Sequence, residues 1–295
     1  MQSSQEGLLR PGEETVFHLF TVKGIPIKVH PFLPALAVLS ALSAIGRGWI
    51  LVLFVLVLYG PILFGTILIH ELGHALETRH LGGHVESIIM WPLGGLALCG
   101  GTVDPWQDLK VAIAGPLTHL PMVFAWWLLL VMATAGSHVS FSQSGLNLMD
   151  DFFAILCIEA CVLNLCLLAF NLFLPAYPLD GGRVMAAALT IKGFDANRAG
   201  IITSRTAIVV ALGVVGFGIW GFVEGNVHAM LTVLIGLWII HASKQLHDLA
   251  TAGRAVEHPL FSRAGTYAVS QQQEHQPQQQ GSKGGARKIV AGSLV

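Results

Sequence analysis

The chain has 295 residues and a formal net charge of −1; 54% of its residues are hydrophobic and only 11% are charged. Soluble domains carry roughly a quarter charged residues, so this composition excludes an ordinary soluble protein and predicts one that lies in a lipid bilayer. A net charge close to zero provides no basic surface for DNA or RNA, so we expect no nucleic-acid partner.

Apolar stretches of membrane-spanning length recur along the chain. A transmembrane helix needs about 20 mainly apolar residues, and six stretches approach or reach that length: 31–46, 49–77, 107–135, 152–174, 205–223 and 227–243. The predicted fold class is therefore an all-α polytopic membrane protein with about six transmembrane helices. Residues 80–103 are rich in glycine and β-branched residues, which predicts a short β-hairpin or re-entrant segment between helices two and three.

Charge and composition also divide the chain. We expect residues 1–30 to form an N-terminal cytoplasmic segment, 31–250 a membrane-embedded domain, and 251–295 a glutamine-rich, disordered tail. If the N-terminus is cytoplasmic, the loops on the opposite side contain Arg47 as their only lysine or arginine. The excess of positive charge on the cytoplasmic side of membrane proteins then predicts a multi-pass protein with both termini in the cytoplasm.

The second apolar stretch ends in the motif His70-Glu71-Leu72-Gly73-His74. Positions i and i+4 share one face of a helix, so both imidazoles can bind one metal ion with the glutamate beside it. A charged side chain at membrane depth costs about 2.5–3.5 kcal/mol on insertion scales, which favours a functional role. The alternative is that the two histidines only form hydrogen bonds across the helix bundle, with Glu71 as a neutralising partner.

A catalytic zinc ion takes three protein ligands and leaves a fourth position for water, so two histidines require another donor. Pro175 and Pro178 are expected to break the fourth helix shortly before Asp180. A broken helix at membrane depth is tolerated where it lines protein or a wet cavity, so Asp180 is well suited to be the third ligand. The alternative is that Asp180 lies in an interfacial turn or caps the following helix.

Together, HELGH and NLFLPAYPLDGGR (171–183) resemble the motifs of the site-2 protease family of intramembrane metalloproteases, and the resemblance covers about residues 22–250. It implies one Zn²⁺ per chain bound by His70, His74 and Asp180, with Glu71 as the general base and Asn171 near the substrate backbone or oxyanion. It also implies substrates that are single-pass membrane proteins, usually trimmed first by another protease.

His119 departs from the family pattern. The segment Ala114–His119 is similar to a family segment that usually ends in asparagine, and here a histidine takes that place. The role of His119 stays open between a substrate contact, a proton relay, a supplementary metal ligand and a packing residue.

These residues predict an intramembrane zinc metalloprotease that hydrolyses peptide bonds within or near transmembrane segments of membrane-protein substrates, the chemistry of regulated intramembrane proteolysis. In such an enzyme Glu71 takes the proton of the attacking water. The substrate could join the 84–101 hairpin as an extended strand. Two other classes remain open: an inactive protease-like scaffold that binds membrane helices, and a transporter of zinc or protons. Against transport, the ionisable groups cluster at one depth.

Overall fold

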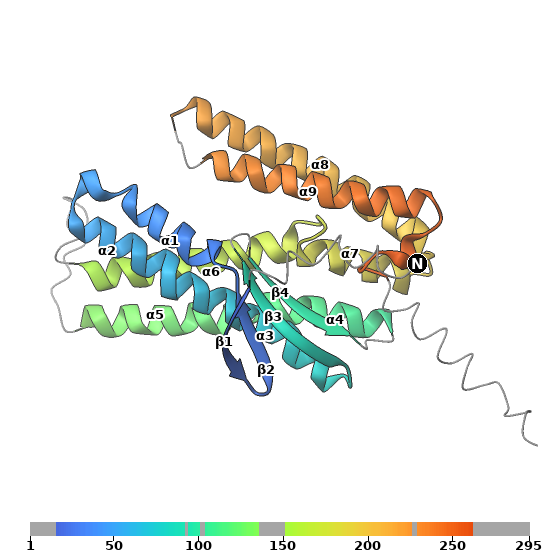
Figure 1. Ribbon diagram of the computed structural model, residues 1–295, viewed down its shortest axis with the longest axis horizontal. Coiled ribbons are helices and arrows are strands. Elements are labelled where there is room, and N and C mark those ends of the chain that lie inside the picture. The colour runs from blue at the N-terminus through green and yellow to red at the C-terminus, as the bar shows by residue number, and fades with distance from the viewer. Residues whose placement is uncertain (1–15, 92–93, 101–103, 136–150, 226–228, 262–295) are drawn as a thin grey trace, which may run out of the picture.

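The computed structural model describes residues 16–91, 94–100, 104–135, 151–225 and 229–261, which form a helical bundle with one small sheet (Figure 1). The predicted fold class is confirmed. The strands and helices, in chain order, are β1 (Phe17–Val22), β2 (Ile25–Val29), α1 (Phe32–Leu42), α2 (Trp49–Val57), α3 (Leu63–His80), β3 (His84–Trp91), β4 (Gly94–Gly100), α4 (Pro105–Leu117), α5 (His119–Ala135), α6 (Phe152–Phe173), α7 (Asp180–Ile191), α8 (Ala196–Val223) and α9 (Ala229–Thr251).

Within the described residues, five helical stretches are long and apolar enough to cross a membrane, so this is an integral membrane protein. A further apolar helical stretch, Phe32–Arg47, is shorter, so the count of about six crossings stays a prediction. The five long stretches are Trp49–His80, Pro105–Ala135, Phe152–Phe173, Ala196–Val223 and Ala229–Thr251.

Two of these stretches contain a local irregularity at a proline. The first joins α2 to α3 through a π-helical turn, η3 (Leu58–Ile62), which contains Pro61. Proline has no backbone N–H to donate, so the regular hydrogen-bond ladder is interrupted there. The second divides at Thr118 into α4 and α5, two residues after Pro116. Both irregularities lie near the residues of the predicted site, because α3 carries the HELGH motif and α5 begins at His119.

The sheet has the strand order β1-β2-β3-β4 among the described residues. β3 and β4 form the predicted antiparallel hairpin, and β2 adds to it in parallel with Ile27 opposite Ile88. The buried side chains of Ile27, Ile88 and Met90 pack with Ala75 of α3. The sheet is therefore fixed against the helix that carries the HELGH motif (Figure 1).

Strands β1 and β2 were not predicted, and they place part of the expected N-terminal segment 1–30 in this sheet. Strand β1 is mostly exposed, with Phe17 67% exposed, so its burial does not alternate as it does in a half-buried strand. Strand β2 pairs with a partner about sixty residues later in the chain, and local sequence patterns do not report such pairing.

The first residues of the expected tail 251–295 are folded. After α9 the chain forms the short turn η4 (Ala255–Glu257), and Phe261 packs into a buried cluster with Ala199 of α8. The ring of His258 lies 5.0 Å from that of Tyr177, and burial lowers the pKa of His258 to about 4. Residues 262–295, with the glutamine-rich segment, lie outside the described residues, so their disorder stays a prediction.

Candidate metal centre

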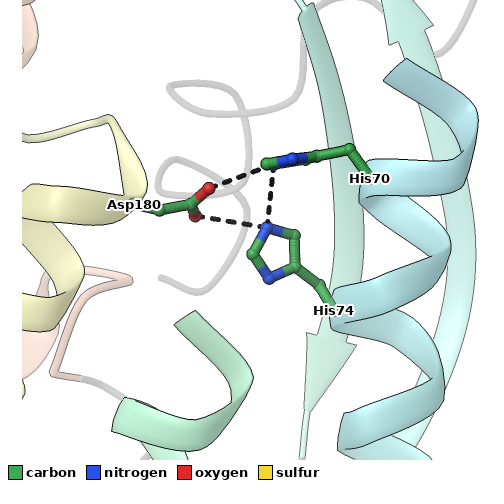
Figure 2. A group of neighbouring side chains, drawn as sticks. All are labelled: His70, His74 and Asp180. Atoms are coloured by element: carbon green, nitrogen blue, oxygen red, sulfur yellow. Dashed lines mark hydrogen bonds and ion pairs between the residues drawn. The ribbon is translucent and has the colours of Figure 1, made fainter. Parts of the chain in front are cut away.

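Three predicted metal ligands point toward one another from two helices (Figure 2). His70 and His74 lie one turn apart on α3, and Asp180 is the first residue of α7. The Nε2 atoms of the histidines are 3.1 Å apart. His70 Nε2 lies 3.0 Å from Asp180 Oδ2, and His74 Nε2 lies 3.2 Å from Asp180 Oδ1. All three side chains are buried, so their polar atoms depend on one another or on a bound ion.

The geometry of this group fits a zinc ion. Ligands about 2.05 Å from a tetrahedral zinc ion lie roughly 3.3 Å apart, close to the separations of these donor atoms. Two imidazoles and one carboxylate also form a donor set known from catalytic zinc sites, in which a fourth position is left for water. The structure thus brings the three predicted ligands into one group of suitable size and chemistry.

The loop between α6 and α7 places Asp180. Helix α6 ends at Phe173, shortly before the two prolines that were expected to end it. The loop is fixed to α9, because the Ser243 hydroxyl donates to the carbonyl of Tyr177 at 2.9 Å. The N-cap residue of α7 is Leu179, and Asp180 lies inside the first turn with its carboxylate directed at the histidines. The alternative role of Asp180 as a helix cap is therefore not what the structure shows.

Glu71 lies beside the metal ligands and is held by the sheet. Its side chain is buried, and its Oε2 atom accepts a hydrogen bond of 3.0 Å from the backbone N–H of Ala97 in β4. Gly95 lies so close that any added Cβ atom would overlap the Glu71 side chain. The hairpin therefore fixes the position of the carboxylate that was predicted to act as the base.

All six predicted site residues line one cavity of about 620 Å³. Its walls also include β4, α9 and the segment after η4, so the membrane helices, the sheet and the folded part of the C-terminal region all contribute. A volume in this range is typical of a ligand site. The predicted residues are His70, Glu71, His74, His119, Asn171 and Asp180.

Comparisons with known proteins agree with this geometry. The profile of peptidase family M50 matches residues 61–156. The putative zinc metalloprotease Rip3 of Mycobacterium tuberculosis is 35% identical over 182 residues, which cover 61% of this chain and 43% of that protein. A zinc metalloprotease of Methanocaldococcus jannaschii is 28% identical over 233 residues, which cover 77% of this chain and 59% of that protein.

A solved structure covers more of the fold. The site-2 protease from Methanocaldococcus jannaschii superposes with a TM-score of 0.54 and 26% sequence identity, over 79% of this chain and 95% of that one. These matches in sequence and in fold support the site-2 protease family for this chain. The family prediction is thus confirmed, although the chain spans only about half the length of the curated relatives, 43% and 59%.

The other two predicted site residues, Asn171 and His119, occupy different places in the fold. Asn171 lies near the end of α6 and lines the cavity. His119 is 1% exposed and lies behind His70, with 3.1 Å between His119 Nε2 and His70 Nδ1. It is not part of the group of three possible metal donors found among the described residues.

Three groups near the site were missed from the sequence. Two are backbone atoms, the Ala97 N–H that holds Glu71 and the Val111 carbonyl, which lies 2.6 Å from His74 Nδ1. Backbone contacts carry no sequence signal. The third is Asn164, a fully buried amide in the apolar helix α6. A polar residue at that depth was a usable signal, because membrane helices bury such groups where they find a partner.

Proposed function

We propose that this protein is an intramembrane zinc metalloprotease that hydrolyses peptide bonds within or near the transmembrane segments of membrane proteins. The observation that carries the proposal is the buried group of His70, His74 and Asp180 with Glu71 beside it, in a cavity between apolar helices. The three ligands would hold one zinc ion per chain. The relatives named as zinc metalloproteases support this choice of metal.

The residues around the ion have separate tasks. When bound, zinc lowers the pKa of water to about 7 and polarises the peptide carbonyl. Ala97 engages Oε2 of Glu71, so we assign proton transfer to Oε1. Glu71 takes the proton as the water oxygen bonds to the carbonyl carbon, and it gives that proton to the amine nitrogen when the C–N bond breaks. Asn171, which lines the cavity, is suited to donate to the developing oxyanion.

The sheet offers a way to hold the substrate open. A substrate helix must unwind before cleavage, because its carbonyl groups are engaged in hydrogen bonds. Strand β4 is the last strand in the sheet order, and its residues Gly94–Ala97 line the cavity beside Glu71. We assign the substrate to this edge as an added strand, which would place its backbone next to the base.

A proline scan of a substrate tests this binding mode. In an antiparallel pair, alternate residues of a strand direct their N–H groups toward the partner. Prolines at alternate positions, two or more residues from the cleaved bond, should therefore slow cleavage by about tenfold, and those between them should have little effect. Cleavage rates for the series provide the measurement. Equal tolerance at all positions would rule out strand addition to β4.

The position of the site favours substrates that cross the membrane once. A transmembrane helix must enter between the enzyme's helices, and we infer that a bulky outer domain is first removed by another protease. The distribution of lysine and arginine supports cytoplasmic termini and a site near the cytoplasmic end of α3. Cleavage should then fall in the cytoplasmic third of the substrate helix, as mass spectrometry of the products can determine. Cleavage near the opposite face would contradict this orientation.

Removing the metal tests the function. Treatment of the purified protein with a chelator should abolish cleavage, and an equimolar amount of zinc should restore it, because the ion is part of the reaction. Asp180→Ala should lose zinc and not be restored, since two histidines alone leave the ion with one ligand too few. Asp248→Ala, which changes an aspartate on α9 far along the chain from the metal ligands, is the matched control and should behave like the wild type. Cleavage that persists in the metal-free protein would exclude a metalloprotease.

A further inference from the structure

A line of buried polar side chains leads away from the metal group on the side of His70. His119, at the start of α5, lies with its Nε2 atom 3.1 Å from Nδ1 of His70, and the two ring centroids are 5.1 Å apart. Asn164 of α6 follows, with its Oδ1 atom 2.9 Å from Nδ1 of His119. His119 is 1% exposed and Asn164 is 0% exposed. The line therefore joins three membrane-spanning stretches through groups that are shielded from solvent.

The contact at the far end of this line shows which atoms donate and which accept along it. The amide nitrogen of Asn164 donates to the carbonyl oxygen of Ala160 at 2.9 Å, one turn earlier in the same helix. An amide nitrogen only donates and an amide oxygen only accepts. Oδ1 of Asn164 therefore faces His119 as an acceptor, and the hydrogen on the His119 ring must lie on Nδ1.

The position of this hydrogen determines the hydrogen bond between His119 and His70. A neutral imidazole with its hydrogen on Nδ1 presents an acceptor at Nε2. His119 Nε2 thus accepts from Nδ1 of His70, which leaves the lone pair of His70 on Nε2, the atom that faces Asp180. Metal-binding histidines need this arrangement, with one ring nitrogen hydrogen-bonded and the other free to bind the ion.

The second histidine reaches the same state by a different route. Nδ1 of His74 lies 2.6 Å from the backbone carbonyl of Val111 in α4, an oxygen that can only accept. His74 is therefore oriented by the backbone, and His70 by two side chains. His119 and Asn164 can each be substituted, so the orientation of His70 can be tested without altering a metal ligand.

We propose that His119 and Asn164 are positioning residues that hold His70 with its Nε2 lone pair toward the metal. This inference rests on the proposed zinc site and adds two residues to it. It also gives His119 a role other than substrate contact or direct metal binding. The expected consequence of losing either residue is weaker zinc binding, by about 10- to 100-fold, as for other contacts that orient a metal ligand.

Two substitutions of Asn164 separate this role from simple packing. Asn164→Leu keeps the branched shape and the number of side-chain heavy atoms but removes the acceptor, whereas Asn164→Asp keeps an acceptor for His119 and brings a carboxylate into an apolar helix. If Asn164 only packs, leucine should be tolerated at least as well as aspartate, because burying a charge is costly. If it orients His119, Asn164→Asp should bind zinc more tightly than Asn164→Leu.

The experiment measures zinc affinity of the purified full-length protein by competition with a chelator, which requires no substrate. We expect His119→Phe and Asn164→Leu to bind zinc at least about tenfold more weakly than wild type. The double variant should be no weaker than His119→Phe alone, because both residues act through one line of contacts. Thr203→Val, a change at a fully buried hydroxyl in α8, is the matched control and should leave the affinity unchanged.

The outcomes distinguish this inference from the proposed function. If wild type binds zinc, Asp180→Ala does not, and both Asn164→Leu and His119→Phe remain within about twofold of wild type, the positioning role is wrong and the zinc site stands. The positioning role is also wrong if Asn164→Leu binds zinc as tightly as Asn164→Asp. If the wild-type protein itself binds no zinc, the proposed function is wrong, and the inference falls with it.

Discussion

Gly115→Ala should remove zinc and cleavage together. Gly115 lies in α4 directly against the imidazole of His74, and a Cβ atom there would overlap the ring at Nε2, the metal-facing nitrogen. The neighbouring contact between His74 Nδ1 and the Val111 carbonyl leaves the ring little room to move. We expect bound zinc to fall below detection and the cleavage rate to drop more than about 100-fold, beyond the usual effect of an outer contact. Elemental analysis and cleavage assays measure the two effects.

Gly213→Ala is the control for this change. Gly213 lies in another membrane helix, α8, and an added Cβ atom would meet no atom within 4 Å. Alanine is the better helix former by about 1 kcal/mol at both positions, so loss of helix stability cannot explain a difference between the two variants. Normal zinc content in Gly115→Ala would contradict the position that we assign to His74.

Gly95→Ala should separate metal binding from catalysis. A Cβ atom on this residue of β4 would overlap the side chain of Glu71, including its Oε1 atom, and the three atoms nearest to that Cβ all belong to Glu71 and none to a metal ligand. Glu71 would have to leave its place beside Ala97. We expect zinc content to stay near that of the wild type and the cleavage rate to fall by about 10²- to 10⁴-fold, the usual contribution of a general base.

The two glycine variants check each other. Both add one methyl group to the surroundings of the same site, so a general effect on folding would change zinc content in both. Gly115→Ala without zinc and Gly95→Ala with zinc would assign the first position to the metal and the second to the base. Cleavage at the wild-type rate in Gly95→Ala would show that Glu71 is not held against the hairpin during the reaction.

The residues of the site could be predicted because their chemistry is local in the sequence. His70 and His74 are four positions apart, and helical geometry alone places them on one face. The partnership with Asp180 spans 110 residues, and it was predicted from the need for a third ligand, from the broken helix at membrane depth and from the family resemblance. The structure brings all three together, and their role as zinc ligands stays a prediction until the metal is measured.

Other features could not be read from local patterns. Helix α8 begins at Ala196, nine residues before the expected start at 205, because Asp195 caps it by accepting from Asn197 N–H and Arg198 N–H. A search for runs of apolar residues ends at such polar residues, although the helix continues through them. The contact of Ala97 with Glu71 also depends on a sheet whose other half comes from residues 17–29. Such contacts arise from the arrangement of distant segments.

The most direct test of the central claim compares wild type with Glu71→Gln. Both proteins should be purified in detergent or liposomes and assayed for bound zinc and for cleavage of single-pass membrane substrates. Glutamine keeps the size of the side chain but cannot accept the proton of the attacking water, so we expect equal zinc content and a loss of cleavage of about 10²- to 10⁴-fold. Cleavage that survives the substitution at equal zinc content would contradict the mechanism.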